Sequence, residues 1–372
     1  MNITTTVLAV GLIVVTAEIV LQFSVYLWRR PRQVYRLMNL YSNGHQSMYM
    51  ADPHSLYRLR SGTYELGRIT INPWGFRDSI MPQMVKQKGE LRLLVIGGST
   101  TFDINCSDHE AWPRVLERLL RANSHRRIHV INGGVGGYTT TESIAALALR
   151  GLEYHPDIVL IHHGYNDVNA VEVNGGFRAD YAHYRPRQWR CDNRNGCLRW
   201  SVIYNLFKLQ TPAYRYFSSL YFMTIRNFNG RDYYAQRHAK QRDQRIQSIG
   251  PKVFIRNIRT LTHICRSVGA KPVILTSNIC ESLAWPSMLH GIHGFNTALR
   301  ELAVRESIAL LDLAKCFPQQ QKLYFEDCCM HTTQKGSAIK AKIVFEGLRK
   351  WVSLQAAEPL RSHAMVEARH DV

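Results

Sequence analysis

The sequence predicts an α/β protein of the flavodoxin-like type, in which helices cover both faces of a parallel sheet of about five strands. Along residues 90–352, short apolar runs alternate with segments of helical periodicity, which is typical of a doubly wound sheet. The first run, 91–96, has five apolar residues among six, as expected of a strand buried on both faces. Glycines and polar residues follow it and two later runs. Because parallel strands end at one edge of the sheet, these residues mark a candidate site.

Each further element is predicted from its own pattern, strands from short apolar runs and helices from apolar residues recurring every three or four positions. Strands are expected at 91–96, 128–131, 158–161, 272–276 and 308–313. Helices are expected at 111–122, 140–152, 253–268, 295–306 and 336–351. Residues 168–251 break this alternation, being rich in Tyr, Arg, Trp and Phe, with a basic helical piece at 231–247. We interpret them as an insertion that caps the site.

The N-terminal region differs from the rest of the chain. Residues 7–28 form a largely apolar run, long enough to cross a bilayer as a helix. The predicted organisation is therefore a membrane anchor at 1–30, an irregular lead-in at 31–89, the main domain at 90–352 and a loose tail at 353–372. Glu18, in the middle of the apolar run, is costly in lipid. Either a helix of this hydrophobicity simply tolerates it, or it pairs with another membrane helix, in a second copy or a separate partner.

The side of the membrane is left open by two opposing signals. Arg29 and Arg30 follow the apolar run at once and favour a cytoplasmic domain, but long domains can translocate regardless of flanking charge. Cys191 and Cys197 bracket a short polar loop and would close it if oxidised, which hints at an oxidising compartment. An extracytoplasmic catalytic domain is our expectation.

The composition indicates anionic partners. The formal net charge is +19 and the isoelectric point is near 9.8. Phospholipid head groups, acidic glycans and nucleic acid would all satisfy this charge. The sequence contains no pair of zinc-binding cysteine motifs, no aromatic motif of RNA-binding sheets and no convincing helix-turn-helix. We therefore expect no nucleic acid partner.

Five residues are candidates for a site. Ser99, Gly137 and Asn166 each follow a predicted strand, and a late loop supplies Asp327 and His331. Each has an ordinary structural explanation when taken alone, since serine and asparagine cap helices, glycines form turns and histidines occur on surfaces. Their joint occurrence in this order is what favours a catalytic site.

These residues stand in motifs that resemble the SGNH hydrolase superfamily, the GDSL-type esterases and lipases. The family's Gly-Asp-Ser is matched by residues 97–99, with Gly98 in place of the aspartate. Its Asn-x-Gly-x-x-Gly stretch is matched by 132–137, and its Gly-x-Asn-Asp by 164–167. The family usually has Asp three residues before His, whereas Asp327 lies four before His331. Residues 71–77 also look like the segment that precedes such domains in membrane-anchored bacterial proteins.

The resemblance implies catalysis through an acyl-enzyme, with no metal and no cofactor. Ser99 would be the nucleophile, His331 its base and later the acid toward the leaving alcohol, and Asp327 the group that orients the imidazole. The oxyanion would be met by the backbone N–H groups of Ser99 and Gly137 and by the side-chain amide of Asn166.

The function expected from these observations is that of a membrane-anchored serine esterase or deacylase acting on an acylated surface glycan or lipid. Two alternatives stay open. The acyl group could pass to a sugar hydroxyl, which would make the protein an O-acyltransferase working beside a membrane acyltransferase. The altered spacing of Asp327 and His331 would also suit a binding module without catalysis.

Overall fold

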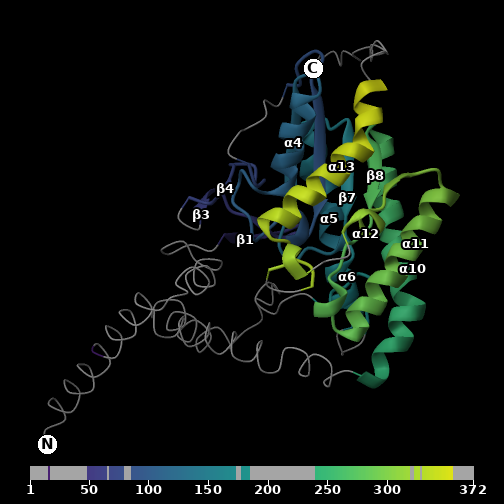
Figure 1. Ribbon diagram of the computed structural model, residues 1–372. Helices are drawn as coiled ribbons and strands as arrows, with labels where there is room; N and C mark the ends of the chain where they lie inside the picture. Colours follow the sequence, from purple (N-terminus) through teal and green to yellow (C-terminus); the bar gives the residue numbers. More distant parts are fainter. Residues whose placement is uncertain are drawn as a thin grey trace, which may run out of the picture.

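The computed structural model describes residue 16 and residues 48–64, 67–78, 85–172, 177–184, 239–318, 322–326 and 329–354 (Figure 1). Among these residues, no helix is both long and apolar enough to cross a membrane. The expected anchor at 7–28 lies outside the described residues, apart from residue 16. So do Glu18, Cys191, Cys197, Asp327 and the tail from 355 onward.

A five-stranded parallel sheet forms the centre of the main domain. Its strand order is β6-β5-β7-β8-β9, which confirms the predicted flavodoxin-like arrangement. The strands are β5 (Leu91–Gly97), β6 (Ile128–Gly134), β7 (Ile158–His162), β8 (Lys271–Leu275) and β9 (Ala309–Leu311). Each neighbouring pair is parallel, and all seven residues of β5 are buried. Since β5 lies between β6 and β7, the segments that follow these three strands emerge side by side.

Helices cover both faces of the sheet (Figure 1). One face carries α4 (Trp112–Ala122) and α13 (Gln334–Leu354), and the other carries α5 (Thr140–Ala146), α6 (Tyr165–Glu172), α10 (Ala239–Ser267) and α11 (Pro286–Arg305). The alternation of side chains along β5 explains both layers. Leu93 and Val95 pack under α4 and α13, whereas Leu94 and Ile96 join the core under the other helices.

Shorter elements connect these layers. They are the α-helices α3 (Ser99–Phe102) and α12 (Leu313–Cys316), the π-helix η1 (Leu147–Gly151), and the 3₁₀ helices η2 (Leu152–Tyr154), η4 (Glu281–Leu283) and η5 (Lys322–Tyr324). The helix predicted at 140–152 is therefore α-helical only to Ala146. It continues as the π-helix η1 and ends as the 3₁₀ helix η2.

Two helices start earlier than the sequence predicts. Helix α10 begins at Ala239 and runs through Pro251, whereas its main part was expected to begin at Val253. A proline removes one helical hydrogen bond, and the packed turns after it, with Phe254 stacked on Phe295 at 4.3 Å between ring centroids, hold the helix in place. Helix α11 begins at Pro286, a residue suited to a first helical position.

The lead-in is more regular than expected. It forms two antiparallel hairpins, β1 (Tyr49–Asp52) with β2 (Leu56–Leu59) and β3 (Gly62–Tyr64) with β4 (Ile69–Ile71). Their apolar side chains share one buried cluster with Phe102, Val135 and Tyr138. Those three residues follow β5 and β6, so the lead-in packs against the edge of the sheet where the predicted site lies.

Candidate active site

Ser99 is the first residue of α3, directly after β5. The residue before it, Gly98, is the N-cap of that helix, and no side chain makes a capping hydrogen bond there. The alternative in which Ser99 merely caps the helix is therefore wrong. Its hydroxyl points elsewhere, toward His331.

Ser99 and His331 are brought into direct contact. Ser99 Oγ and His331 Nε2 are 2.8 Å apart, and both residues are half-buried. His331 belongs to a short antiparallel turn, in which Phe325 and Thr332 form a β-bridge and His331 O accepts from Glu326 N at 3.1 Å. A serine hydroxyl and an imidazole nitrogen at this distance can exchange a proton, which is what activation of a serine nucleophile requires.

Gly137 lies in a turn that follows β6. Tyr138 N donates to Val135 O at 3.1 Å, and Gly137 has φ +83°, a value that favours glycine. Gly137 is exposed at the edge of the sheet. Its backbone N–H is thus placed in a tight turn beside the serine segment.

Asn166 is held against both of the other strand ends. Its Nδ2 donates to Tyr138 O at 2.9 Å, and since an amide nitrogen carries two N–H groups, a second one remains to serve an oxyanion. Asn166 also accounts for the unusual glycine before Ser99. A Cβ added at Gly98 would lie 2.6 Å from Asn166 Nδ2. In this protein the amide of Asn166 therefore occupies the space that a side chain at position 98 would need.

The remaining predicted site residue, Asp327, lies outside the described residues, so its part in the site stays a prediction. Within the described ranges, the structure holds no group of three or more His, Cys, Asp or Glu side chains placed to bind a metal ion. The cysteines at 106, 265, 280, 316 and 329 form no disulfide bond.

A small pocket opens over the assembled residues. Its lining comes from the ends of β5 and β7 and from the turn after β6: Gly98, Ser99, Thr100, Tyr138, His162, His163, Gly164, Tyr165 and Asn166. A larger cavity of about 240 Å³ lies beside the β1–β2 hairpin, lined by Asp52, His54, Ser55, Ala145, Leu149 and Arg150. It contains none of the predicted site residues, and the chemistry favours the smaller pocket.

Asp103 connects the serine segment to the histidine turn, a contact that the sequence analysis missed. Its carboxylate accepts from Thr332 Oγ1 at 3.2 Å and from Ser337 Oγ, and its backbone has φ 63° at the end of α3. Because Thr332 adjoins His331, Asp103 ties the nucleophile and its base together. No motif marks it, although an aspartate four residues after the serine is a signal that could have been weighed.

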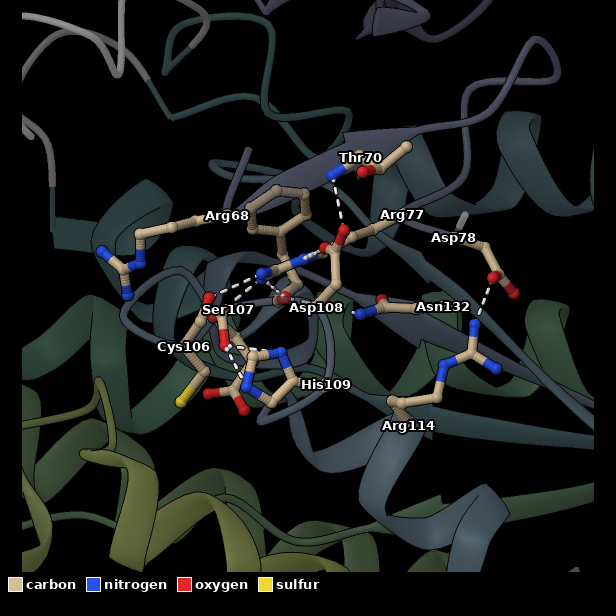
Figure 2. A network of polar contacts seen from close by, with 12 residues as sticks. Arg68, Thr70, Arg77, Asp78, Cys106, Ser107, Asp108, His109, Arg114 and Asn132 are labelled. Atoms are coloured by element: carbon tan, nitrogen blue, oxygen red, sulfur yellow. Dashed lines mark hydrogen bonds and ion pairs between the residues drawn. The ribbon is translucent and has the colours of Figure 1, made fainter. Parts of the chain in front are cut away.

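Arg77, from the lead-in, makes a network of hydrogen bonds with the same segment (Figure 2). Its buried guanidinium donates to Phe102 O at 2.7 Å, to Asp103 O at 2.9 Å and to Cys106 O. Arg77 thereby adds a charged donor to the carbonyls of Phe102 and Asp103, at the end of α3. Asp108 pairs with Arg77 Nε at 3.1 Å and accepts from Thr70 N at 2.7 Å, so the lead-in strand, the arginine and the serine segment form one network (Figure 2).

Charged and titratable groups are buried beneath the pocket. Burial lowers the pKa of His163 to about 3 and raises the pKa of Asp167 to about 7, although hydrogen bonds from Thr140 oppose the latter shift. Asp167 Oδ1 accepts from Thr140 N at 3.1 Å and from Thr140 Oγ1 at 2.6 Å, which joins α6 to α5. Asp167 Oδ2 is buried without a hydrogen bond, 3.8 Å from His163 Nδ1. Burial thus disfavours the charged forms of both groups beneath the pocket.

The fold and this edge of the sheet define an α/β protein with a serine–histidine pair suited to ester chemistry. Residues 95–339 match the GDSL-like lipase/acylhydrolase family. Over 76 residues, which are 20% of this chain and 38% of the relative, the sequence is 34% identical to an arylesterase of Vibrio mimicus. The chain therefore spans well under half the length of that relative.

Two solved structures are similar to this chain at low sequence identity. A catalytic mutant of an acetylxylan esterase from Geobacillus stearothermophilus aligns with 69% of this chain and 94% of its own, at 16% identity and a TM-score of 0.42. A GDSL-like lipase from Bacteroides thetaiotaomicron aligns with 73% of this chain and 91% of its own, at 12% identity and a TM-score of 0.40. The family match is what decides: the chain belongs to the GDSL-like lipase/acylhydrolase family.

The buried carboxyl of Asp167 generates a prediction about stability and pH. Its pKa is raised from 3.8 to about 7 in the folded protein, so the stability it contributes is complete below about pH 4 and is lost as the pH rises toward 7. Asp167→Asn cannot ionise and keeps an oxygen for Thr140. We expect its unfolding free energy to rise relative to wild type across this window, by at most about 4 kcal/mol at about 1.4 kcal/mol per pKa unit.

Denaturant unfolding of both proteins from pH 4 to pH 8 measures this difference. Asp180→Asn, at an exposed aspartate, is the control. A difference between Asp167→Asn and wild type that stays constant with pH would contradict the prediction.

Proposed function

We propose that the protein cleaves esters through an acyl-enzyme formed on Ser99, and that its substrate is an acylated surface glycan or lipid. The observation that carries the mechanism is the 2.8 Å contact between Ser99 Oγ and His331 Nε2 at the carboxyl edge of the sheet. His331 takes the hydroxyl proton as Ser99 attacks the acyl carbon, and returns it to the leaving alcohol. Water then attacks the acyl-enzyme with the same histidine as base.

The developing oxyanion is met by the N–H groups of Ser99 and Gly137 and by the amide of Asn166. Each preorganised donor of this kind is worth about 10²–10³ in rate. The arrangement of Gly98 and Asn166 supports this role, because the amide fills the space directly beside the serine.

A surface substrate is suggested by two features of the sequence, its net charge of +19 and its apolar N-terminal run. We propose that residues 7–28 anchor the protein in a membrane, that Glu18 pairs with a companion helix, and that the catalytic domain faces away from the cytoplasm.

The tagged full-length protein should then stay in the membrane pellet after an alkaline wash and be cleaved by protease added from outside. Recovery in the supernatant would refute the anchor.

Replacing the proposed nucleophile is the direct test of the mechanism. Ser99→Ala in the full-length protein should lower kcat on a chromogenic acetyl ester by on the order of 10⁴-fold or more, since no acyl-enzyme can form. Ser124→Ala, in a turn after α4, is the matched control and should keep wild-type activity. Activity retained in Ser99→Ala would overturn the mechanism.

The same assay, with a glycan acceptor present, separates hydrolysis from transfer. Acetate released without acetylated glycan supports the deacylase. Acetylated glycan formed at the expense of acetate would instead establish an O-acyltransferase, which would draw its acyl groups from a membrane acyltransferase partner.

The acid of the proposed triad is tested by Asp327→Asn. This change preserves size but leaves the His331 cation unsupported and its tautomer unfixed, so kcat should fall by about 10²–10⁴-fold. The control is Glu326→Gln, which changes the neighbouring carboxylate and should have little effect. If Asp327→Asn keeps full activity while Glu326→Gln loses it, the acid is Glu326.

A further inference from the structure

The β1–β2 hairpin of the lead-in lies directly over the turn that holds Gly137. Tyr57, in β2, is only 6% exposed, and its hydroxyl donates to Gly136 O at 2.9 Å. The hydroxyl oxygen of Tyr57 also lies 2.6 Å from the position that a Cβ on Gly137 would take. The hydroxyl therefore sits against the peptide unit that joins Gly136 to Gly137.

That peptide unit is the one that carries the proposed oxyanion donor. The carbonyl of Gly136 and the N–H of Gly137 belong to one planar trans peptide, so they point in opposite directions. When Tyr57 holds the carbonyl on the side of the hairpin, the N–H of Gly137 must point away from it. A hydrogen bond at one end of the peptide thus sets the direction of the donor at the other end.

The turn itself does not choose this orientation. Residues 135–138 form a tight turn closed by Tyr138 N and Val135 O, and the two central residues are both glycine. The central peptide of such a turn can flip between type I and type II geometry, which reverses its carbonyl and its N–H. Glycines have no Cβ to penalise either form, so an external contact is needed to select one.

Tyr57 is well placed to supply this contact because its own position is fixed. Its ring packs edge-on against Tyr138 at 5.2 Å and against Tyr49 at 5.7 Å between centroids. Its backbone carbonyl accepts from Tyr138 Oη and, at 3.2 Å, from Ser55 Oγ. Burial raises the pKa of Tyr57 well above its usual value, which keeps the hydroxyl protonated and able to donate.

We propose that Tyr57 is a positioning residue that holds the Gly136–Gly137 peptide in the orientation in which the N–H of Gly137 meets the oxyanion. This inference rests on the proposed function, since it assigns to the lead-in the alignment of one of its three oxyanion donors. The hairpin is thereby part of the active site, although it supplies no group that touches the reacting atoms.

Tyr57→Phe in the full-length protein removes only the hydroxyl. We expect kcat on p-nitrophenyl acetate to fall about 10-fold, less than the 10²–10³ that follows complete loss of a donor, with KM within about twofold of wild type. The matched control is Tyr64→Phe in β3, where the hydroxyl makes the same kind of bond, to Arg60 O at 2.9 Å, within the lead-in. This control should keep the wild-type kcat.

A second substrate separates alignment of the donor from general damage. In the thionoacetate of the same phenol, sulfur replaces the carbonyl oxygen, and sulfur is a weak hydrogen-bond acceptor. A misdirected donor should therefore slow the reaction of the oxygen ester more than that of the sulfur ester. The ratio of kcat on the oxygen ester to kcat on the sulfur ester should fall in Tyr57→Phe but not in Tyr64→Phe. An unchanged ratio in Tyr57→Phe would overturn the positioning role, even if the variant is less stable or less active.

Ser99→Ala in the same assay keeps the two proposals apart. If Ser99→Ala is inactive and Tyr57→Phe equals wild type in kcat and in the ratio, the serine mechanism stands and the role of Tyr57 falls. If Ser99→Ala retains activity, the mechanism falls, and the inference about Tyr57 falls with it.

Discussion

The site depends on a hydrogen bond between two residues that are 232 positions apart, Ser99 and His331. A hydroxyl and an imidazole exchange a proton only within about 2.6–3.2 Å, so small shifts of either segment would separate them. Ser99 is fixed by β5, which is buried along its whole length, and by the short helix that begins at the serine. His331 comes from a turn in which Phe325 and Thr332 form a β-bridge and Glu326 N donates to His331 O. Asp103 joins the two segments, and this explains why a charged residue is buried there.

The lead-in belongs to the hydrolase domain in physical terms. Its hairpins share an apolar cluster with residues that follow β5 and β6, and Arg77 binds three carbonyls around the end of α3. A buried guanidinium is favourable only when its donors are satisfied, and carbonyls at a helix end offer acceptors that need donors. Arg77 and the serine segment therefore stabilise each other, and Tyr57 extends the same support to the turn at Gly137.

Burial acts on the titratable groups beneath the pocket by disfavouring their charged forms. Burial lowers the pKa of His162 well below its usual value, and Lys340, also buried, has a lowered pKa for the same reason. Lys340 nevertheless reaches Thr100 O at 3.3 Å, next to the serine. In both groups the shift has the same cause, because the interior cannot give the solvation that a charge requires.

The sequence by itself determined which segments form the parallel strands and which residues stand at their ends. Apolar runs and helical periodicity depend on burial, which each segment records in its own residues, so the parallel sheet and the positions of Ser99, Gly137 and Asn166 followed from local pattern. Helix starts were less accurate: the periodicity of α10 and α11 did not reveal that they begin at Ala239 and Pro286. The hairpins of the lead-in were likewise not predicted, and the segment was expected to be irregular, because strands of three or four residues give too few positions for a clear alternation.

Only the tertiary structure decided which of the ordinary residues support the site. Tyr57 and Gly136 are 79 positions apart, and Asp103 and Thr332 are 229 apart. Contacts from a side chain to a distant carbonyl or hydroxyl leave no motif, because any backbone carbonyl can accept. They form when the folded sheet brings the ends of its strands, the lead-in and the late histidine turn to one edge, and this convergence is a property of the whole chain.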